Sequence, residues 1–260
     1  MGKLVQTCNC GRVVQLHFLK SFVFAVAVVI WTLVLSPTLP FLRLTNASSA
    51  KVRAVSQLWA NGIVFLLKYV IGLRYQERGR ANVPAGPCII ACNHQSLWET
   101  VTLSAIFPEA SIVAKKELID IPIVGWYLYK YPMILVDRDA GRNALRQIVE
   151  ETGRAVGEGR KVLLFPQGTR QSIDEPLRFH SAGVCALYTG LDLPVVPAAH
   201  NSGLFWGKKT WMIRGGLITV SYLPPIPPGL KRKEFQETME RQIADETARL
   251  LRKAEATAIG

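Results

Sequence analysis

The chain has 260 residues, of which 49% are hydrophobic, and its formal net charge is +12. This length fits one α/β domain with appendages or two small domains. The positive charge favours anionic partners such as membrane surfaces, phosphate-bearing substrates or acidic carrier proteins, while the lack of a zinc-finger or RNA-binding aromatic motif argues against nucleic acid.

The N-terminal region combines a basic leader with a long apolar segment. Lys3, Arg12 and Lys20 precede the uncharged stretch Ser21–Leu42, whose core, Phe22–Leu35, is strongly apolar. A stretch of this length predicts a membrane helix. A cleaved signal peptide is the alternative, since small residues follow at positions 45–47.

A second apolar segment, Val55–Leu73, favours an anchor over a signal peptide. Two such segments joined by a short linker predict a helical hairpin that spans the membrane or lies partly within one leaflet. A hairpin returns the chain to the side of the basic leader, which the positive-inside rule places in the cytoplasm. We therefore predict a membrane-associating hairpin over residues 1–72 and a catalytic domain over residues 73–260, on the cytoplasmic face of a bacterial inner membrane.

From Leu73 onward, short apolar strands alternate with helical stretches. This alternation predicts an α/β fold, a mostly parallel sheet flanked by helices. The strand candidates are Leu73–Glu77, Cys88–Cys92, Ser111–Ala114, Met133–Val136, Lys161–Phe165, Val195–Ala199 and Leu217–Tyr222. The helix candidates are Leu97–Phe107, Val124–Lys130, Arg142–Val156 and Ala182–Leu191, and an amphipathic tail helix is predicted over Lys231–Lys253.

The stretch from Cys88 to Glu99 reads as a buried strand, a turn and a helix start. Ser96 is a good N-cap, and Glu99 follows three residues later, as in a capping box. His94 then lies at the mouth of a strand, just before a helix N-terminus, where α/β folds bind ligands. Histidine is suited to take a proton near neutral pH, and a carboxylate could fix its tautomer. Read alone, a single loop histidine such as His94 is more often structural than catalytic, and Glu99 is better explained as a capping residue.

A second stretch, Leu163–Arg170, ends an apolar strand at Pro166. Gly168 allows a tight turn or a close approach to a ligand. Thr169 and Arg170 supply a hydroxyl and a planar donor fork that suits a phosphate. Read alone, this stretch is also typical of an ordinary strand-to-loop turn with an exposed arginine.

The cysteines and histidines do not indicate a metal or a disulfide framework. Cys88 and Cys92 fall in one strand, Cys185 falls in a helix, and Cys8 and Cys10 lie in the leader. An odd count in mostly apolar settings fits reduced thiols. The four histidines are not at ligand spacing with carboxylates, so we expect no metal.

Together, these stretches resemble the glycerolipid acyltransferase family. In that family a His-x4-Asp block precedes a Phe-Pro-Glu-Gly-Thr-Arg block, as Asn93–Glu99 precedes Phe165–Arg170 here. The match is closest to bacterial enzymes that acylate 1-acyl-glycerol-3-phosphate, and it covers about Leu73 to Tyr222. Further matching segments are Lys115–Leu118 with Pro122 and Gly125, Val136–Arg138, and Val195–Ala199.

The resemblance implies direct acyl transfer in phospholipid biosynthesis. His94 would accept the proton of the sn-2 hydroxyl of lysophosphatidic acid as it attacks an acyl thioester, and Glu99 would orient His94. Acyl-CoA or acyl carrier protein would be the co-substrate, with no cofactor, and the product would be phosphatidic acid in membrane phospholipid. Backbone amides near Gly168 or after Ser96 are candidate oxyanion donors. The expected substrate-binding residues are Lys115, Arg138, Gln167, Gly168, Thr169 and Arg170.

Two residues depart from the family pattern. Glu99 stands where Asp is usual, which keeps the charge on a longer arm. Gln167 stands where Glu is usual, so this position cannot act as an acid or base. Alternatives therefore stay open: acylation of glycerol-3-phosphate or of a lyso-aminolipid, or a basic membrane-binding protein with no catalysis.

Overall fold

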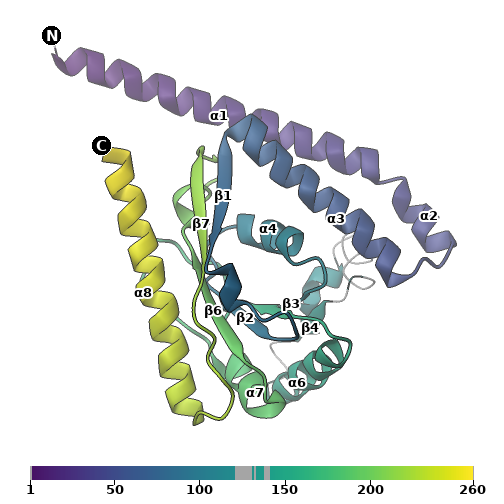
Figure 1. The fold of residues 1–260 in the computed structure, drawn as a ribbon. Coiled ribbons are helices and arrows are strands. Elements are labelled where there is room, and N and C mark those ends of the chain that lie inside the picture. The colour runs from purple at the N-terminus through teal and green to yellow at the C-terminus, as the bar shows by residue number, and fades with distance from the viewer. Residues whose placement is uncertain (1, 121–130, 132, 138–140, 260) are drawn as a thin grey trace.

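The computed structural model describes residues 2–120, 131, 133–137 and 141–259. Its centre is a seven-stranded sheet in the order β1-β7-β6-β2-β5-β3-β4 (Figure 1). The strands are β1 (Leu73–Arg78), β2 (Ile89–Cys92), β3 (Ser111–Lys115), β4 (Ile134–Val136), β5 (Val162–Leu164), β6 (Val195–His200) and β7 (Gly216–Tyr222).

The sheet is parallel except at one junction. Strands β6, β2, β5, β3 and β4 all run the same way, and β7 pairs with β6 in the antiparallel sense. Strand β1 is parallel to β7, so this pair runs opposite to the other five strands. The predicted mostly parallel sheet is confirmed, and each predicted strand ends within about one residue of the observed one, well inside the usual uncertainty of such boundaries.

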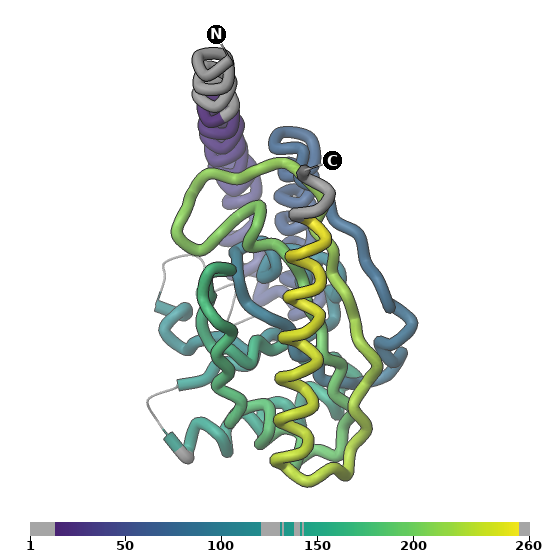
Figure 2. Tube along the Cα trace, turned by 90° about the vertical axis from the view of Figure 1, so that its left-hand side faces the viewer, coloured from purple at the N-terminus to yellow at the C-terminus, as the bar shows by residue number. Residues whose placement is uncertain are grey.

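Helices cover both faces of the sheet, which explains why its strands are apolar on both sides. One face carries the N-terminal helices and α4 (Trp98–Ile106), while the other carries α6 (Arg142–Gly157), α7 (Ala182–Leu191) and α8 (Arg232–Ile259). Figure 2 shows α8, in yellow, running along the length of the part of the chain that follows the hairpin. The helix predicted over Val124–Lys130 lies outside the described residues.

Both apolar segments predicted near the N-terminus are helical, and the helices begin earlier in the chain than predicted. The N-terminal hairpin consists of α1 (Gly2–Leu35), α2 (Thr38–Leu44), α3 (Ser49–Leu66) and a π-helical turn at Leu67–Ile71. Two stretches, Val14–Leu44 and Ser49–Ile71, are long and apolar enough to cross a membrane. Only 11% of the apolar window in the first is buried, so its side chains face outward rather than into a protein core.

The inner side of the hairpin belongs to the main hydrophobic core. Phe24, Ile63, Leu67 and Ile71 are buried in one cluster with strand residues such as Ile90. The predicted division between residues 72 and 73 falls at the start of β1, but the packing across it is continuous. A truncation that removes residues 1–72 would therefore uncover part of the core as well as release an anchor.

Helices α1 and α3 approach closely because Gly62 has no side chain. The indole N–H of Trp31 donates to the carbonyl oxygen of Trp59 at 3.2 Å, and that of Trp59 donates to the Thr32 hydroxyl at 3.0 Å. A Cβ atom at Gly62 would lie 2.2 Å from Nε1 of Trp31. The close contact thus requires a residue that is otherwise poor in a helix interior.

We expect Gly62→Ala to lower the free energy of unfolding by about 1–3 kcal/mol, the usual cost of overpacking. Gly153→Ala, in the interior of α6, is the matched control, because a Cβ there meets its nearest neighbour at an ordinary 3.5 Å. That control should gain up to about 1 kcal/mol from helix propensity. Thermal unfolding in detergent measures both, and equal stabilisation by the two substitutions would contradict the packing argument.

Candidate active site

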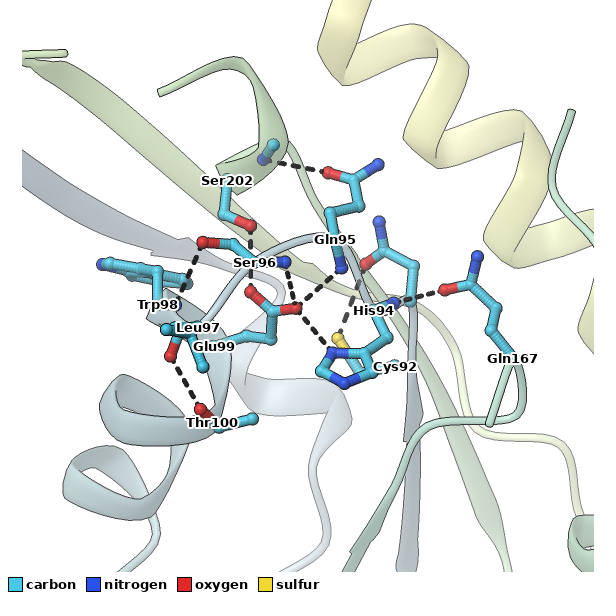
Figure 3. Close-up of polar contacts among 12 residues, drawn as sticks. Cys92, His94, Gln95, Ser96, Leu97, Trp98, Glu99, Thr100, Gln167 and Ser202 are labelled. Atoms are coloured by element: carbon cyan, nitrogen blue, oxygen red, sulfur yellow. Dashed lines mark hydrogen bonds and ion pairs between the residues drawn. The ribbon is translucent and has the colours of Figure 1, made fainter. Parts of the chain in front are cut away.

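Polar side chains gather where the parallel strands end. His94 follows β2, residues 167–170 follow β5, and Ser202 follows β6, and these three strands are neighbours in the sheet. Their carboxyl ends share one edge, which is where open α/β sheets place ligand sites. Figure 3 shows the loops converging on His94 and Glu99.

His94 and Glu99 form a direct hydrogen-bonded pair. Nδ1 of His94 lies 2.8 Å from Oε1 of Glu99. The carboxylate can only accept, so Nδ1 carries the proton and Nε2 has the free lone pair. The ring also stacks on Phe165, with centroids 4.4 Å apart and planes 17° from parallel. Stacking and pairing together fix the ring orientation, and the His94 side chain stays 15% exposed.

Glu99 is completely buried and accepts three further hydrogen bonds. The backbone N–H groups of Gln95 and Ser96 each donate to Oε1 at 2.7 Å. The Ser202 hydroxyl donates to Oε2 at 3.0 Å (Figure 3). A buried carboxylate needs such compensation, since its desolvation is costly. The turn before α4 is therefore folded around this one side chain.

The surroundings of Glu99 favour its ionised form. Burial acts to raise the pKa of the carboxyl group, but the His200 and His94 imidazoles and the Ser96 N–H more than offset it. The net pKa lies below the usual range. Glu99 thus holds a negative charge against the ring edge of His94 that carries the proton.

His200 is a structural histidine beneath this pair. Burial lowers the pKa of its imidazole, although the Glu99 carboxylate acts in the opposite direction. Its Nε2 lies 2.9 Å from the carbonyl oxygen of Asn93 and so donates to it, while Nδ1 accepts the Ser202 N–H at 3.4 Å. Nε2 is 3.9 Å from Oε2 of Glu99, which is too far for a hydrogen bond. The Asn93 side chain bonds both backbone groups of His200, each at 2.9 Å.

The start of α4 differs in detail from the predicted capping box. The helix begins at Trp98, and the Ser96 hydroxyl accepts the Trp98 N–H at 3.1 Å. Glu99 reaches back to the Ser96 N–H as a capping box requires, but its carboxylate serves Gln95 and His94 as well. The two readings of Glu99, as a cap and as a histidine partner, are therefore both realised in one side chain.

Gln167 has internal hydrogen-bond partners. Its Oε1 accepts the backbone N–H of His94, and its Nε2 donates to Gln171 at 2.8 Å. Gln171 in turn donates its backbone N–H to the His94 carbonyl oxygen at 2.9 Å. The buried amide of Gln167 thus ties the loop after β5 to the loop after β2, and its place among the substrate-binding residues stays a prediction.

The remaining predicted site residues that the structure describes lie at the same edge of the sheet. Gly168 has a φ of +70°, which favours glycine, and its N–H donates to the Phe165 carbonyl oxygen at 2.9 Å. Thr169 is exposed and Arg170 half-buried in the loop that follows β5. Lys115 is exposed at the end of β3, and Arg138 lies outside the described residues.

Four backbone N–H groups among or beside the candidate oxyanion donors already have hydrogen-bond partners. The N–H of Gly168 bonds within its own turn, and those of Gln95, Ser96 and Trp98 bond to Glu99 or Ser96. These four groups therefore cannot point at a substrate oxygen without breaking an existing bond. Within the described ranges, no cluster of three His, Cys, Asp or Glu residues could hold a metal ion.

Sequence reasoning missed His200 and Ser202 as parts of the site. Ser202 is 103 positions from Glu99 along the chain, and no short motif joins them. The available signal was their place: both lie at the end of a strand whose carboxyl edge carries the predicted site.

Comparisons with known proteins agree on one family. A family model described as Acyltransferase matches residues 74–201. A 1-acyl-sn-glycerol-3-phosphate acyltransferase from Pseudomonas aeruginosa is 39% identical over 72% of this chain and 69% of its own length. The human 1-acyl-sn-glycerol-3-phosphate acyltransferase beta is 32% identical over 62% of this chain and 58% of its own.

The fold is also shared with a solved structure. The 1-acyl-sn-glycerophosphate (LPA) acyltransferase PlsC from Thermotoga maritima superposes with a TM-score of 0.72, over 90% of this chain and 95% of that one. At 20% sequence identity, this likeness shows the architecture.

The lowered pKa of Glu99 makes a prediction about stability and pH. A carboxyl group with a lower pKa in the fold than in the unfolded chain stabilises the fold above its usual pKa of about 4.3, and this contribution is lost as the pH falls through the folded value. Glu99→Gln lacks this contribution. The difference in unfolding free energy between wild type and variant should therefore shrink as the pH falls from about 7 towards 3.

Urea unfolding at a series of pH values measures this difference. A gap that stays constant would mean that the fold leaves the pKa of Glu99 unchanged, and a gap that widens towards acid would mean that the fold raises it; either result would contradict the prediction.

Proposed function

The chain belongs to the acyltransferase family, and we propose that it transfers a fatty acyl group to the sn-2 hydroxyl of 1-acyl-sn-glycerol-3-phosphate. The product of this reaction is phosphatidic acid. The observation that carries the proposal is the His94–Glu99 pair, in which Nδ1 is committed at 2.8 Å to a buried carboxylate and Nε2 is left to accept a proton.

The proposed reaction is a single displacement. Nε2 of His94 takes the hydroxyl proton while the substrate oxygen attacks the thioester carbonyl carbon. The new ester C–O bond forms, the C–S bond breaks, and the imidazolium returns its proton to the departing thiolate. Glu99 stabilises the positive ring during this step, and groups positioned in this way typically contribute 10²- to 10⁴-fold to rate.

Neither nearby nucleophile supports an acyl-enzyme. Ser96 is fully buried and its hydroxyl accepts the Trp98 N–H. Cys92 is also buried, and burial raises the pKa of its thiol well above the usual value, so it stays protonated. A thiol in that form is a poor nucleophile, which favours direct transfer to the lipid hydroxyl.

The phosphate of the acceptor is assigned to basic residues at the ends of neighbouring strands. In the order β5-β3-β4, Arg170 follows the first strand, Lys115 ends the second, and Arg138 comes two residues after the third in the sequence. Lys115 and Arg170, at the ends of neighbouring strands, suit a phosphate dianion, and arginine can bind it in a bidentate way; Arg138 joins this assignment from the sequence alone. Gly168 and Thr169 complete the proposed substrate-binding loop.

The apolar hairpin associates the chain with a membrane, where both acceptor and product reside. We assign the catalytic part to the cytoplasmic side, because acyl-CoA and acyl carrier protein are cytoplasmic donors and the leader is basic. Membrane phospholipid is then the surrounding medium as well as the metabolic destination of the product.

We expect His94→Ala to lower turnover by at least ~10²-fold, because the proton acceptor is lost. The assay supplies lysophosphatidic acid with acyl-CoA or acyl carrier protein and measures free thiol. His180→Ala is the matched control, since His180 is exposed and outside the pair, and it should keep wild-type turnover.

Other acceptors and plain lipid binding give distinct results in the same assay. Near-normal turnover in His94→Ala would overturn the mechanism. Thiol release with a lyso-aminolipid or glycerol-3-phosphate, but not with lysophosphatidic acid, would overturn the acceptor. Vesicle binding without thioester consumption would favour a basic membrane-binding protein.

A further inference from the structure

Ser202 contacts the His94–Glu99 pair through Glu99 but lies outside the sequence motifs that carry the pair. It follows β6 in a short 3-10 turn, Ser202–Leu204, and its side chain has no exposed surface. The family model matches residues 74–201 and so ends just before it.

The contact between Ser202 and Glu99 differs from the other three around that carboxylate. Oε1 of Glu99 accepts from His94 and from two backbone N–H groups, whereas Oε2 accepts from the Ser202 hydroxyl at 3.0 Å. The backbone donors are fixed by the fold of the turn. Ser202 is therefore the side chain that holds the far oxygen of Glu99, and with it the rotation of the carboxylate plane.

The position of Ser202 is itself tightly determined. Its N–H donates to Nδ1 of His200 at 3.4 Å, and the next N–H, from Gly203, donates to the Gln95 side chain at 3.2 Å. A Cβ atom at Gly203 would lie 2.6 Å from the side chain of Ile173, so only glycine fits this close approach. Hydrogen bonds to His200 and Gln95 and the close contact with Ile173 therefore fix the position of this turn.

The same connection between β6 and β7 reaches the membrane hairpin. The Ser21 hydroxyl of α1 accepts the backbone N–H of Ile213 at 2.8 Å. Phe24 of α1 packs edge-on against Trp206, with the ring centroids 6.0 Å apart. The segment that carries Ser202 thus contacts the turn before α4 at one end and the hairpin at the other.

We propose that Ser202 is a positioning residue for acyl transfer, which holds the Glu99 carboxylate in the orientation that keeps Oε1 on Nδ1 of His94. This role rests on the proposed function, because it acts through the pair that moves the proton. Without the hydroxyl, the carboxylate can turn about its last torsion angle, and Oε1 no longer points steadily at the ring. Preorganised groups of this kind act on the transition state rather than on substrate binding.

The test compares three serine substitutions in the full-length protein. Ser202→Ala should lower kcat roughly tenfold, the lower range for a hydrogen bond to a charged group, with KM for both substrates within about twofold. Ser202→Cys replaces the hydroxyl by a slightly larger thiol that is only a weak donor, so it should lose a similar factor. Ser221→Ala is the matched control: Ser221 is a buried serine bonded to the Glu246 carboxylate of α8 on the other face of the sheet, and its loss should leave kcat unchanged.

A spectroscopic readout makes the test independent of turnover. In protein with nitrogen-labelled histidine, the Nδ1–H resonance of His94 is assigned by its loss in His94→Ala. Ser202→Ala should shift this resonance, and Ser221→Ala should not.

The outcomes separate this inference from the proposed function. Wild-type kcat in Ser202→Ala, full recovery in Ser202→Cys, or an unmoved His94 resonance would each overturn the positioning role. If the wild-type protein released no thiol with lysophosphatidic acid, the proposed function would fail. The resonance would still report whether Ser202 fixes the position of the Glu99 carboxylate against His94.

Discussion

The site depends on one buried charge. Glu99 is an ionised carboxylate with no exposed surface, and such a group is stable inside a protein only when donors surround it. Four donors do so: a histidine ring, two backbone N–H groups and a serine hydroxyl. Because these donors come from the turn after β2 and from the turn after β6, one side chain fixes the relative placement of both. The geometry of the His94–Glu99 pair thus follows from the need to surround a buried charge with donors.

The sheet topology brings these donors together, and the hairpin completes the support. Neighbouring parallel strands deliver His94, Ser202 and the loop of residues 167–170 to one edge. Strand β7 is antiparallel to β6. The connection between them contacts Glu99 through Ser202 and contacts α1 through Ile213. The inner side of the hairpin is part of the main core. Membrane association and catalytic geometry are therefore built on one packed unit.

Much of this arrangement could be predicted from the sequence, for reasons that lie in particular residues. Buried strands read as apolar runs with Pro, Gly or polar residues at their ends, and this is why Ile89–Cys92 and Val162–Leu164 were predicted to within about one residue. The pairing of His94 with Glu99 could be expected because both fall in one short block. The antiparallel β6–β7 junction could not, since nothing local in Gly216–Tyr222 specifies a partner or a direction. The roles of Ser202 and Gln167 depend on contacts 103 and 73 positions apart, which only the folded chain brings together.

The central claim is that Glu99 acts on His94 through its negative charge, beyond its role at the helix start. The most direct measurement is the turnover number of Glu99→Gln, taken beside its melting temperature. The amide retains an acceptor oxygen for the turn, so the variant should stay folded, but it cannot stabilise an imidazolium. We predict a loss of turnover of at least ~10²-fold. Wild-type turnover in a folded Glu99→Gln protein would contradict the claim and leave Glu99 as a helix cap alone.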